Sequence, residues 1–270
     1  MLKQRVWTAL VLAPVVLAGL FLSSFEVFKL FVALIVALGA WEWSNLSGLK
    51  SYSSRFAYSA LVCALIALAN FVSPAGQFEL FLSVSVLFWL LALYWVLKFP
   101  SISGWQAVWH RGLIGLLVLV SSWMALVSIQ RHPGGDELLF MLLLLVWGAD
   151  IGAYFAGKTW GNKKLAPNVS PGKTMAGLWG GLTACGLIAS GFVIYLELEL
   201  LAGVYLLLLS VVAGLASVLG DLFESMLKRH RGIKDSSHLL PGHGGVLDRI
   251  DSIVSAAPVF VLGVYALSIV

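Results

Sequence analysis

Residues 138–156, LLFMLLLLVWGADIGAYFA, contain one charged side chain, Asp150, in nineteen positions. A helix of about 20 mostly apolar residues is long enough to cross the ~30 Å hydrocarbon core of a bilayer. This segment therefore predicts a membrane-spanning helix. A carboxylate is costly in such a helix, so Asp150 is a candidate functional residue, with a structural ion pair to Lys158 or Lys173 as the alternative.

The composition of the whole chain indicates the same class of protein. Charged residues make up 11% of the 270 positions and hydrophobic residues 60%, whereas a soluble domain carries about 25% charged residues. So little polar surface cannot coat a soluble globule, which excludes that class. Nine segments are apolar and long enough to span a bilayer: residues 6–22, 25–41, 56–72, 78–97, 112–129, 138–156, 175–195, 204–221 and 253–270.

The basic residues predict the orientation of these segments, because Lys and Arg concentrate on the cytoplasmic side of membrane proteins. If the N-terminus is cytoplasmic, the inner segments hold all of the 17 Lys and Arg residues except Lys29 and Arg131. We therefore expect an all-α integral membrane protein with about nine transmembrane helices, a cytoplasmic N-terminus and a C-terminus outside.

The sequence also divides into two regions with different content. Residues 1–135 carry the first five spans, and residues 136–270 carry the last four. The second region holds the two longest polar connections, 157–174 and 222–252, both predicted on the inner side. Because the outer loops are short, we expect the chemistry in these two connections.

The connection 222–252 interleaves carboxylates with cations. If the preceding helix continues past Asp221, then Asp221 and Lys228 share one face, and Asp248 and Asp251 would lie on one side of a further helical turn. Mg²⁺ takes carboxylate and phosphate oxygens as ligands, and phosphates also bind basic side chains and backbone N–H groups. The connection therefore suits a metal–polyphosphate complex, and the alternative is a positive-inside loop that contacts anionic lipid.

The connection 157–174 ends in a second candidate phosphate site. Residues 170–172 precede an apolar segment, and we expect Lys173 and Thr174 in the first turn of its helix, where the helix dipole favours phosphate. The stretch is not a P-loop, because that motif requires glycine where this chain has Pro167.

Both connections resemble the signature of the phosphatidate cytidylyltransferases, also called CDP-diacylglycerol synthases. The matching residues of the longer run are Ser225, Leu227, Lys228, Arg229, Lys234, Asp235, Ser237, Leu240, Pro241, His243, Gly244, Gly245, Val246, Asp248, Arg249, Ile250 and Asp251. Those of the other region are Asp150, Gly152, Tyr154, Gly161, Lys164, Ser170, Pro171, Lys173 and Thr174. One departure is Ala176, where members of the family often carry an acidic residue.

The resemblance implies an integral enzyme of the cytoplasmic (inner) membrane with its active site on the cytoplasmic side. Such an enzyme joins CTP and phosphatidic acid into CDP-diacylglycerol and releases pyrophosphate. The implied partners are CTP, phosphatidic acid, membrane lipid and a second copy of the chain in a homodimer, with no nucleic acid. The implied cofactor is Mg²⁺, with a second, monovalent ion such as K⁺.

Three sets of site residues follow from these motifs and the resemblance. The predicted catalytic residues are Asp221, Asp248, Lys173, Arg249 and His243, of which His243 is expected to contact phosphate rather than act as a general base. The predicted metal ligands are Asp221, Asp248, Asp251 and Asp150. The predicted substrate-binding residues are Ser170, Thr174, Lys228, Arg229, Lys234, Gly244 and Gly245.

Two other functions fit parts of the sequence. A CTP-dependent polyprenol kinase shares the nucleotide and the membrane but transfers the γ-phosphoryl group, and the complete run from Lys234 to Asp251 favours cytidylyl transfer. A membrane transporter would place charges near mid-membrane and show repeated halves. Here the charges gather at one interface and no repeat is evident.

Small residues in the seventh and eighth predicted spans are expected to let helix backbones approach closely. They are Gly177, Gly180, Gly181, Gly186, Ala213 and Gly214.

Overall fold

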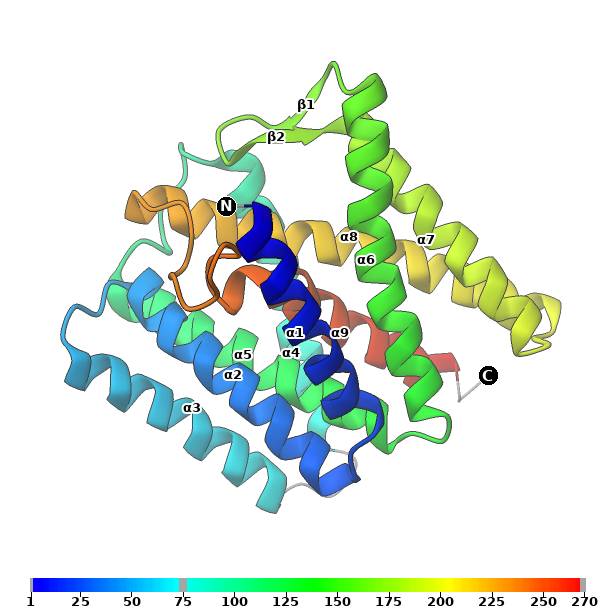
Figure 1. Ribbon diagram of the computed structural model, residues 1–270, viewed down its shortest axis with the longest axis horizontal. Coiled ribbons are helices and arrows are strands. Elements are labelled where there is room, and N and C mark those ends of the chain that lie inside the picture. The colour runs from blue at the N-terminus through cyan, green and yellow to red at the C-terminus, as the bar shows by residue number, and fades with distance from the viewer. Residues whose placement is uncertain (1, 73–76, 268–270) are drawn as a thin grey trace.

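The computed structural model describes residues 2–72 and 77–267, which form nine helices and one β-hairpin (Figure 1). The elements are α1 (Leu2–Phe21), α2 (Phe25–Ser47), α3 (Tyr52–Val72), α4 (Gln77–Lys98), α5 (Val108–Arg131), α6 (Gly135–Trp160), β1 (Lys164–Ala166), β2 (Ser170–Thr174), α7 (Met175–Tyr195), α8 (Leu200–Arg231) and α9 (Leu247–Leu267).

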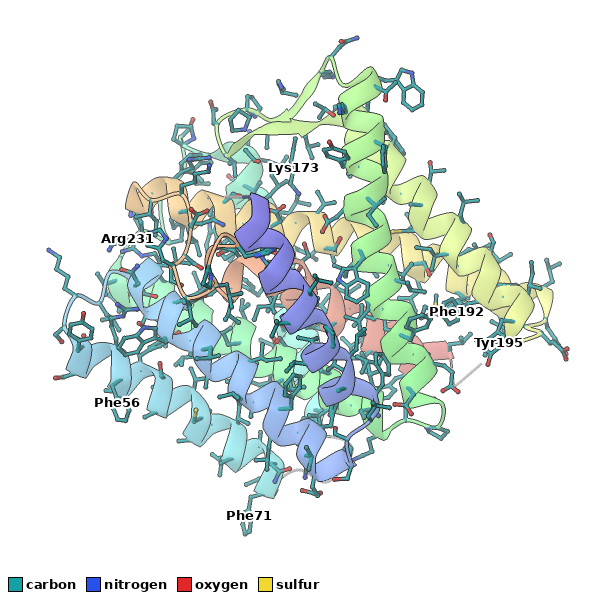
Figure 2. The ribbon with its side chains drawn as sticks, viewed as in Figure 1. Phe56, Phe71, Lys173, Phe192, Tyr195 and Arg231 are labelled. Carbon is teal, nitrogen blue, oxygen red and sulfur yellow. The ribbon has the colours of Figure 1, made fainter. Side chains whose placement is uncertain are left out.

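Seven of the described helices, α3 to α9, are long and apolar enough to cross a membrane. Their outward faces agree with a lipid environment, since α3 exposes Phe56 and Phe71 to 70% and 89% at its two ends (Figure 2). Large exposed apolar surfaces are unfavourable in water but not in hydrocarbon. The prediction of a multi-pass helical membrane protein is therefore confirmed, while nine spans and the sides of the two termini stay predictions.

The all-α prediction needs one correction, in the connection after α6. Strands β1 and β2 pair there in antiparallel register, with Lys164 opposite Thr174 and Ala166 opposite Ser170. The residue before a proline is pushed out of the helical region, so Ser170, which precedes Pro171, favours the extended backbone.

Lys173 and Thr174 are consequently strand residues, and their predicted place in the first turn of a helix is wrong. Thr174 is instead the N-cap of α7, because its hydroxyl oxygen accepts a hydrogen bond from the Gly177 N–H at 3.1 Å. A threonine in this position satisfies one of the free N–H groups at a helix start.

The connection 222–252 is also much shorter than predicted. Helix α8 continues past Asp221 to Arg231, and α9 begins at Leu247, six residues before the predicted span. Four basic residues in the last turn of α8 complement the negative end of its dipole. Gly232 then ends the helix in the left-handed conformation, with φ +68°. Only residues 232–246 remain as a loop, which we call the α8–α9 loop.

Helices α6 and α7 pack so closely that their backbones touch. An added Cβ at Gly152 would lie 2.5 Å from the Gly180 carbonyl oxygen, and one at Gly181 would lie 2.7 Å from that of Ala149. Added Cβ atoms at Gly177 and Gly214 would likewise lie 3.0 Å from the Ala153 oxygen and 2.8 Å from the Cys185 sulfur.

The predicted close packing is thus confirmed for Gly177, Gly180, Gly181 and Gly214, and Ala213 is buried. It is wrong for Gly186, which has open space within 4 Å of an added Cβ. The tight α6–α7 pair brings Asp150 of α6 beside the start of α7 and the hairpin.

An aromatic cluster fixes α8 against α2 and α4. The centroid of the Phe223 ring lies 5.7 Å from the ring centroids of Phe88 and Trp89 and 6.5 Å from those of Trp43 and Trp95. Phe223 is two residues beyond Asp221, so this packing sets the position of the polar end of α8.

Candidate active site

The predicted site residues converge where the β-hairpin meets the polar end of α8. Lys173 lies between β2 and α8 (Figure 2), and its Nζ is 2.7 Å from Oδ2 of Asp221. The hairpin, α6, α7 and α8 enclose a pocket of about 380 Å³. Its polar lining residues include Asp150, Lys158, Lys173, Thr174 and Asp221.

Asp150 faces this pocket from α6. Its charge interacts with those of Lys173, Asp221 and Arg249, so residues from β2, α8 and α9 all influence one carboxylate. Lys158 also lines the pocket from α6, and its Nζ lies 5.7 Å from the centre of the Tyr154 ring. Of the two lysines considered as partners for Asp150, Lys173 is the one that interacts with its charge.

A second charged cluster lies deeper, between α8 and α9. Lys228 Nζ is 2.7 Å from Asp248 Oδ1 and 3.1 Å from Glu224 Oε2. The side chains of Lys228, Glu224 and Asp248 are only 11%, 3% and 7% exposed. Buried charges are stable only when paired and hydrogen-bonded, so this cluster holds α8 and α9 in a fixed relation.

Asp251 connects the two clusters. It lies one turn beyond Asp248 on α9, and its charge interacts with those of Asp221, Glu224 and Lys228. The four carboxylates predicted as metal ligands are therefore electrostatically linked around one end of α8, although they come from three helices.

Asp248 is the most heavily bonded of these carboxylates. Besides Lys228, it accepts hydrogen bonds from the N–H of Ser236 at 3.0 Å, the hydroxyl of Ser236 at 2.9 Å and the N–H of Gly245 at 2.7 Å. A carboxylate has about four lone-pair sites. Asp248 thus ties together α8 and both ends of the α8–α9 loop.

The donor chemistry of this region suits Mg²⁺, which prefers carboxylate oxygens. Within residues 2–72 and 77–267, no group of three or more His, Cys, Asp or Glu side chains is arranged around a common metal position. Two of the predicted ligands are paired with lysines, since Lys173 contacts Asp221 and Lys228 contacts Asp248. Asp221 is the more accessible of the two, since its side chain is 30% exposed and borders the pocket.

The two predicted substrate-binding glycines have a clear steric role. Gly244 adopts φ +84°, and an added Cβ there would lie 2.7 Å from Oδ2 of Asp248. An added Cβ at Gly245 would collide with the Ser236 hydroxyl. Because the Gly245 N–H already donates to Asp248, these glycines let the loop close tightly around that carboxylate.

Arg229 and Asn168 fix the turn of the hairpin. The Nε of Arg229 donates to the Val169 carbonyl at 3.1 Å, and the Asn168 amide donates to the Phe99 carbonyl at 3.3 Å. In Figure 1 the turn lies beside the segment that joins α4 to α5. Arg229, predicted to bind substrate, therefore also anchors the hairpin that carries Lys173.

The remaining predicted residues surround these clusters. Lys234 and Arg249 are exposed, and Ser170 is half-buried at the start of β2. The Nδ1 atom of His243 is buried and has no hydrogen-bond partner among the residues that the structure describes. Their predicted roles toward substrate stay predictions.

The sequence reasoning missed Glu42, which lies on α2 and is fully buried. Its carboxylate accepts hydrogen bonds from the N–H groups of Val246 and Leu247 at 3.0 and 2.6 Å. It also accepts from the hydroxyls of Ser236 and Ser237. A signal was available, because Glu42 is a lone carboxylate at the end of an apolar segment, as Asp150 is.

The fold and the site together define a multi-pass helical membrane protein with aspartates and lysines clustered at the ends of its helices. Residues 3–267 match the model of the cytidylyltransferase family, and the chain belongs to this family. It is 47% identical to the phosphatidate cytidylyltransferase of Pseudomonas aeruginosa, over 96% of each chain. The phosphatidate cytidylyltransferases of Haemophilus influenzae and Brucella suis are 39% and 34% identical, over 96% and 97% of this chain and 97% and 92% of theirs.

Proposed function

We propose that this protein is a phosphatidate cytidylyltransferase, which converts CTP and phosphatidic acid into CDP-diacylglycerol and pyrophosphate. The observation that carries the proposal is the 47% identity to a protein of that name along nearly the whole of both chains. The site supports it, because lysines and carboxylates gather around a pocket at the ends of apolar helices, where a lipid phosphate and a soluble nucleotide can meet.

The chemistry requires positioning more than covalent assistance. An ionised phosphate oxygen of phosphatidic acid attacks the α-phosphorus of CTP, and the bond from that phosphorus to the bridging oxygen of the β-phosphate breaks. The electron pair of this bond leaves with pyrophosphate. Phosphoryl transfers of this kind depend on in-line geometry and on neutralised charge, so no protein nucleophile is needed.

The chain supplies cations for this purpose from two elements. Lys173 on β2 borders the pocket, and Arg249 on α9 interacts with the same Asp150 carboxylate as Lys173 does. Charge-assisted hydrogen bonds from such side chains stabilise negative charge on the phosphates as it develops. Thr174 lines the pocket beside Lys173 and holds the start of α7 in place.

Asp221 and Asp150 are the carboxylates we propose to hold Mg²⁺, because both line the pocket, whereas Asp251, the third predicted ligand, does not. A bound Mg²⁺ would supply charge neutralisation for the phosphates of CTP. A metal bond to Asp248, the fourth predicted ligand, would have to replace one of its four hydrogen bonds.

The proposal places the site on the cytoplasmic face of the inner membrane, where CTP is found. The supporting observation is the one-sided distribution of Lys and Arg in the sequence. In this topology α1 and α2 add two spans to the seven apolar helices, with the N-terminus inside and the C-terminus outside. The homodimer and a monovalent ion such as K⁺ belong to the same proposal and rest on the family resemblance.

The purified protein, incubated with labelled CTP, Mg²⁺ and phosphatidic acid in mixed micelles, tests the proposal. CDP-diacylglycerol and pyrophosphate in equal amounts are expected. CDP with a phosphorylated lipid would instead indicate a kinase, and the absence of either product would contradict the proposed activity. A parallel reaction with EDTA tests the metal requirement.

A further inference from the structure

Glu42 belongs to the region of the chain that carries none of the predicted site residues. We infer that Glu42 is a positioning residue for the proposed cytidylyl transfer, and this inference rests on that proposed function. It fixes the two ends of the α8–α9 loop and the start of α9, and thereby sets the position of Asp248. The inference concerns orientation, since Glu42 is fully buried and accepts its hydrogen bonds from protein groups.

The contacts of Glu42 span almost the entire sequence. Its oxygens take the N–H groups of Val246 and Leu247, which are free at the start of α9. They also accept hydrogen bonds from the hydroxyls of Ser236 and Ser237, in the first half of the loop. A single carboxylate therefore caps one helix and closes one loop at the same time.

The position of Glu42 is itself fixed by arginines around the end of α2. Arg55 donates to the Trp41 carbonyl at 3.0 Å, Arg231 to that of Asn45 at 3.0 Å, and Arg111 to that of Ser47 at 2.7 Å. Guanidinium groups are favourable at the negative end of a helix dipole. They come from α3, α8 and α5, so three neighbouring helices hold the last turn of α2.

Glu42 and Asp248 meet at one hydroxyl group. The Oγ of Ser236 lies 3.1 Å from Oε2 of Glu42 and 2.9 Å from Oδ2 of Asp248. An added Cβ at Gly245 would lie 2.6 Å from the same Glu42 oxygen. The Ser236 hydroxyl has one proton, which the two carboxylates share. A change in the carboxylate of Glu42 therefore acts on groups that also bond Asp248, since the N–H groups of Ser236 and Gly245 donate to it.

Burying the carboxylate of Glu42 costs more free energy than burying an apolar side chain in the same space. Burial of an ionised carboxylate requires several donors to offset lost hydration, and all four donors here belong to the segment that surrounds Asp248. An apolar side chain would fill the space without that cost but could not orient four polar groups. This choice of residue favours a role in geometry over a role in packing.

The test is a steady-state assay of Glu42→Gln in the full-length protein. Glutamine keeps the shape of the side chain but offers one acceptor oxygen to four donors and places an NH₂ group against the others. We expect kcat per folded protein to fall by about 10- to 100-fold, the range seen when groups that orient ligands are removed. The KM for CTP should change much less, because Glu42 does not border the pocket.

The matched control is Glu26→Gln, on the first turn of the same helix. Its carboxylate is 76% exposed and pairs with Lys29 at 2.8 Å. This variant should keep the wild-type kcat, which shows that loss of a carboxylate from α2 does not by itself impair turnover.

A double-mutant cycle with Ser236→Ala separates positioning from general stabilisation. Because Glu42 and Asp248 share the Ser236 hydroxyl, the losses of the two single variants should not multiply in the double variant. If Glu42→Gln fails to fold, Ser237→Ala decides the question, since it removes one donor to Glu42 and should lower kcat by a smaller factor.

Three results would overturn the inference. The first is an unchanged kcat in Glu42→Gln, or in Ser237→Ala if Glu42→Gln does not fold. The second is a lower melting temperature with a normal kcat per folded protein, and the third is a pair of losses that multiply in the double-mutant cycle. Each of these presupposes that the wild-type protein makes CDP-diacylglycerol. Failure of the wild-type protein to do so would contradict the proposed function instead.

Discussion

At the scale of single residues, two aspartates of the candidate site, Asp221 and Asp248, each have a lysine against them. Asp221 pairs with Lys173 on the exposed side, whereas Asp248 pairs with Lys228 inside the protein. The exposed pair can exchange its partner for a ligand at low cost, because solvent screens the charges. The buried pair cannot, because a buried charge left alone is strongly destabilising.

This difference predicts a specific effect of Asp221→Asn. Under the proposed function the variant should lower kcat by about 100-fold or more, because it removes a carboxylate that we propose as a ligand of Mg²⁺. Its melting temperature should stay close to that of the wild type. Glu199→Gln is the control, since Glu199 is an exposed carboxylate at the other end of α8. A rate near normal in Asp221→Asn would remove this residue from the metal site.

At the scale of elements, the β-hairpin is the main feature that the sequence did not predict. Its turn is anchored by Arg229 of α8 and by the carbonyl of Phe99, and its second strand presents Lys173 to Asp221. The hairpin therefore holds the Lys173 ammonium group against the Asp221 carboxylate of α8.

Two substitutions of Arg229 distinguish anchoring from phosphate binding. Lysine keeps the charge but cannot reproduce the Nε hydrogen bond to Val169. If Arg229 acts mainly as an anchor, Arg229→Lys should raise the KM for CTP as much as Arg229→Ala does. Recovery of the wild-type KM in the lysine variant would assign Arg229 to a phosphate contact instead.

The close packing of α6 and α7 gives a matched pair of glycine substitutions. Alanine is favoured over glycine in a helix by about 1 kcal/mol, so Gly186→Ala, in open space, should leave the melting temperature equal or higher. Gly180→Ala should lower it by several degrees, because the added Cβ collides with Ala156 and would lie 2.7 Å from the Gly152 oxygen. Thermal unfolding in detergent measures both, and equal stability of the two variants would contradict the packing argument.

At the scale of the whole molecule, the proposed topology makes a labelling prediction. In a background with Cys63→Ala and Cys185→Ala, a single Lys234→Cys should react with a membrane-impermeant maleimide only after cells are permeabilised. A single Asp136→Cys, in the first turn of α6, should react in intact cells. The reverse pattern would invert the orientation of the bundle.

The whole molecule also shows that the two predicted regions are not independent. Residues 1–135 carry none of the predicted site residues, yet Glu42 on α2 bonds the loop that encloses Asp248. The arginines that hold α2 come from both regions, since Arg231 lies on α8 and Arg55 on α3.

Residue composition and order were enough to predict the membrane class, the apolar helices and the charged residues around the site. Hydropathy and charge are properties of composition and order, so they are readable without coordinates. The continuation of α8 past Asp221 entered only as a condition for placing Asp221 and Lys228 on one face, since the predicted span ended at residue 221.

The pairing of the charges and the contacts between distant segments became clear only from the folded chain. The Lys173–Asp221 pair joins residues on different elements. Glu42 accepts hydrogen bonds from Ser236, 194 positions away in the α8–α9 loop, and from Leu247, 205 positions away at the start of α9. Such contacts depend on how helices pack rather than on local spacing. The hairpin was missed because a short extended stretch between helices has no hydrophobic period, and its conformation follows from Pro171 and from the anchors that α8 provides.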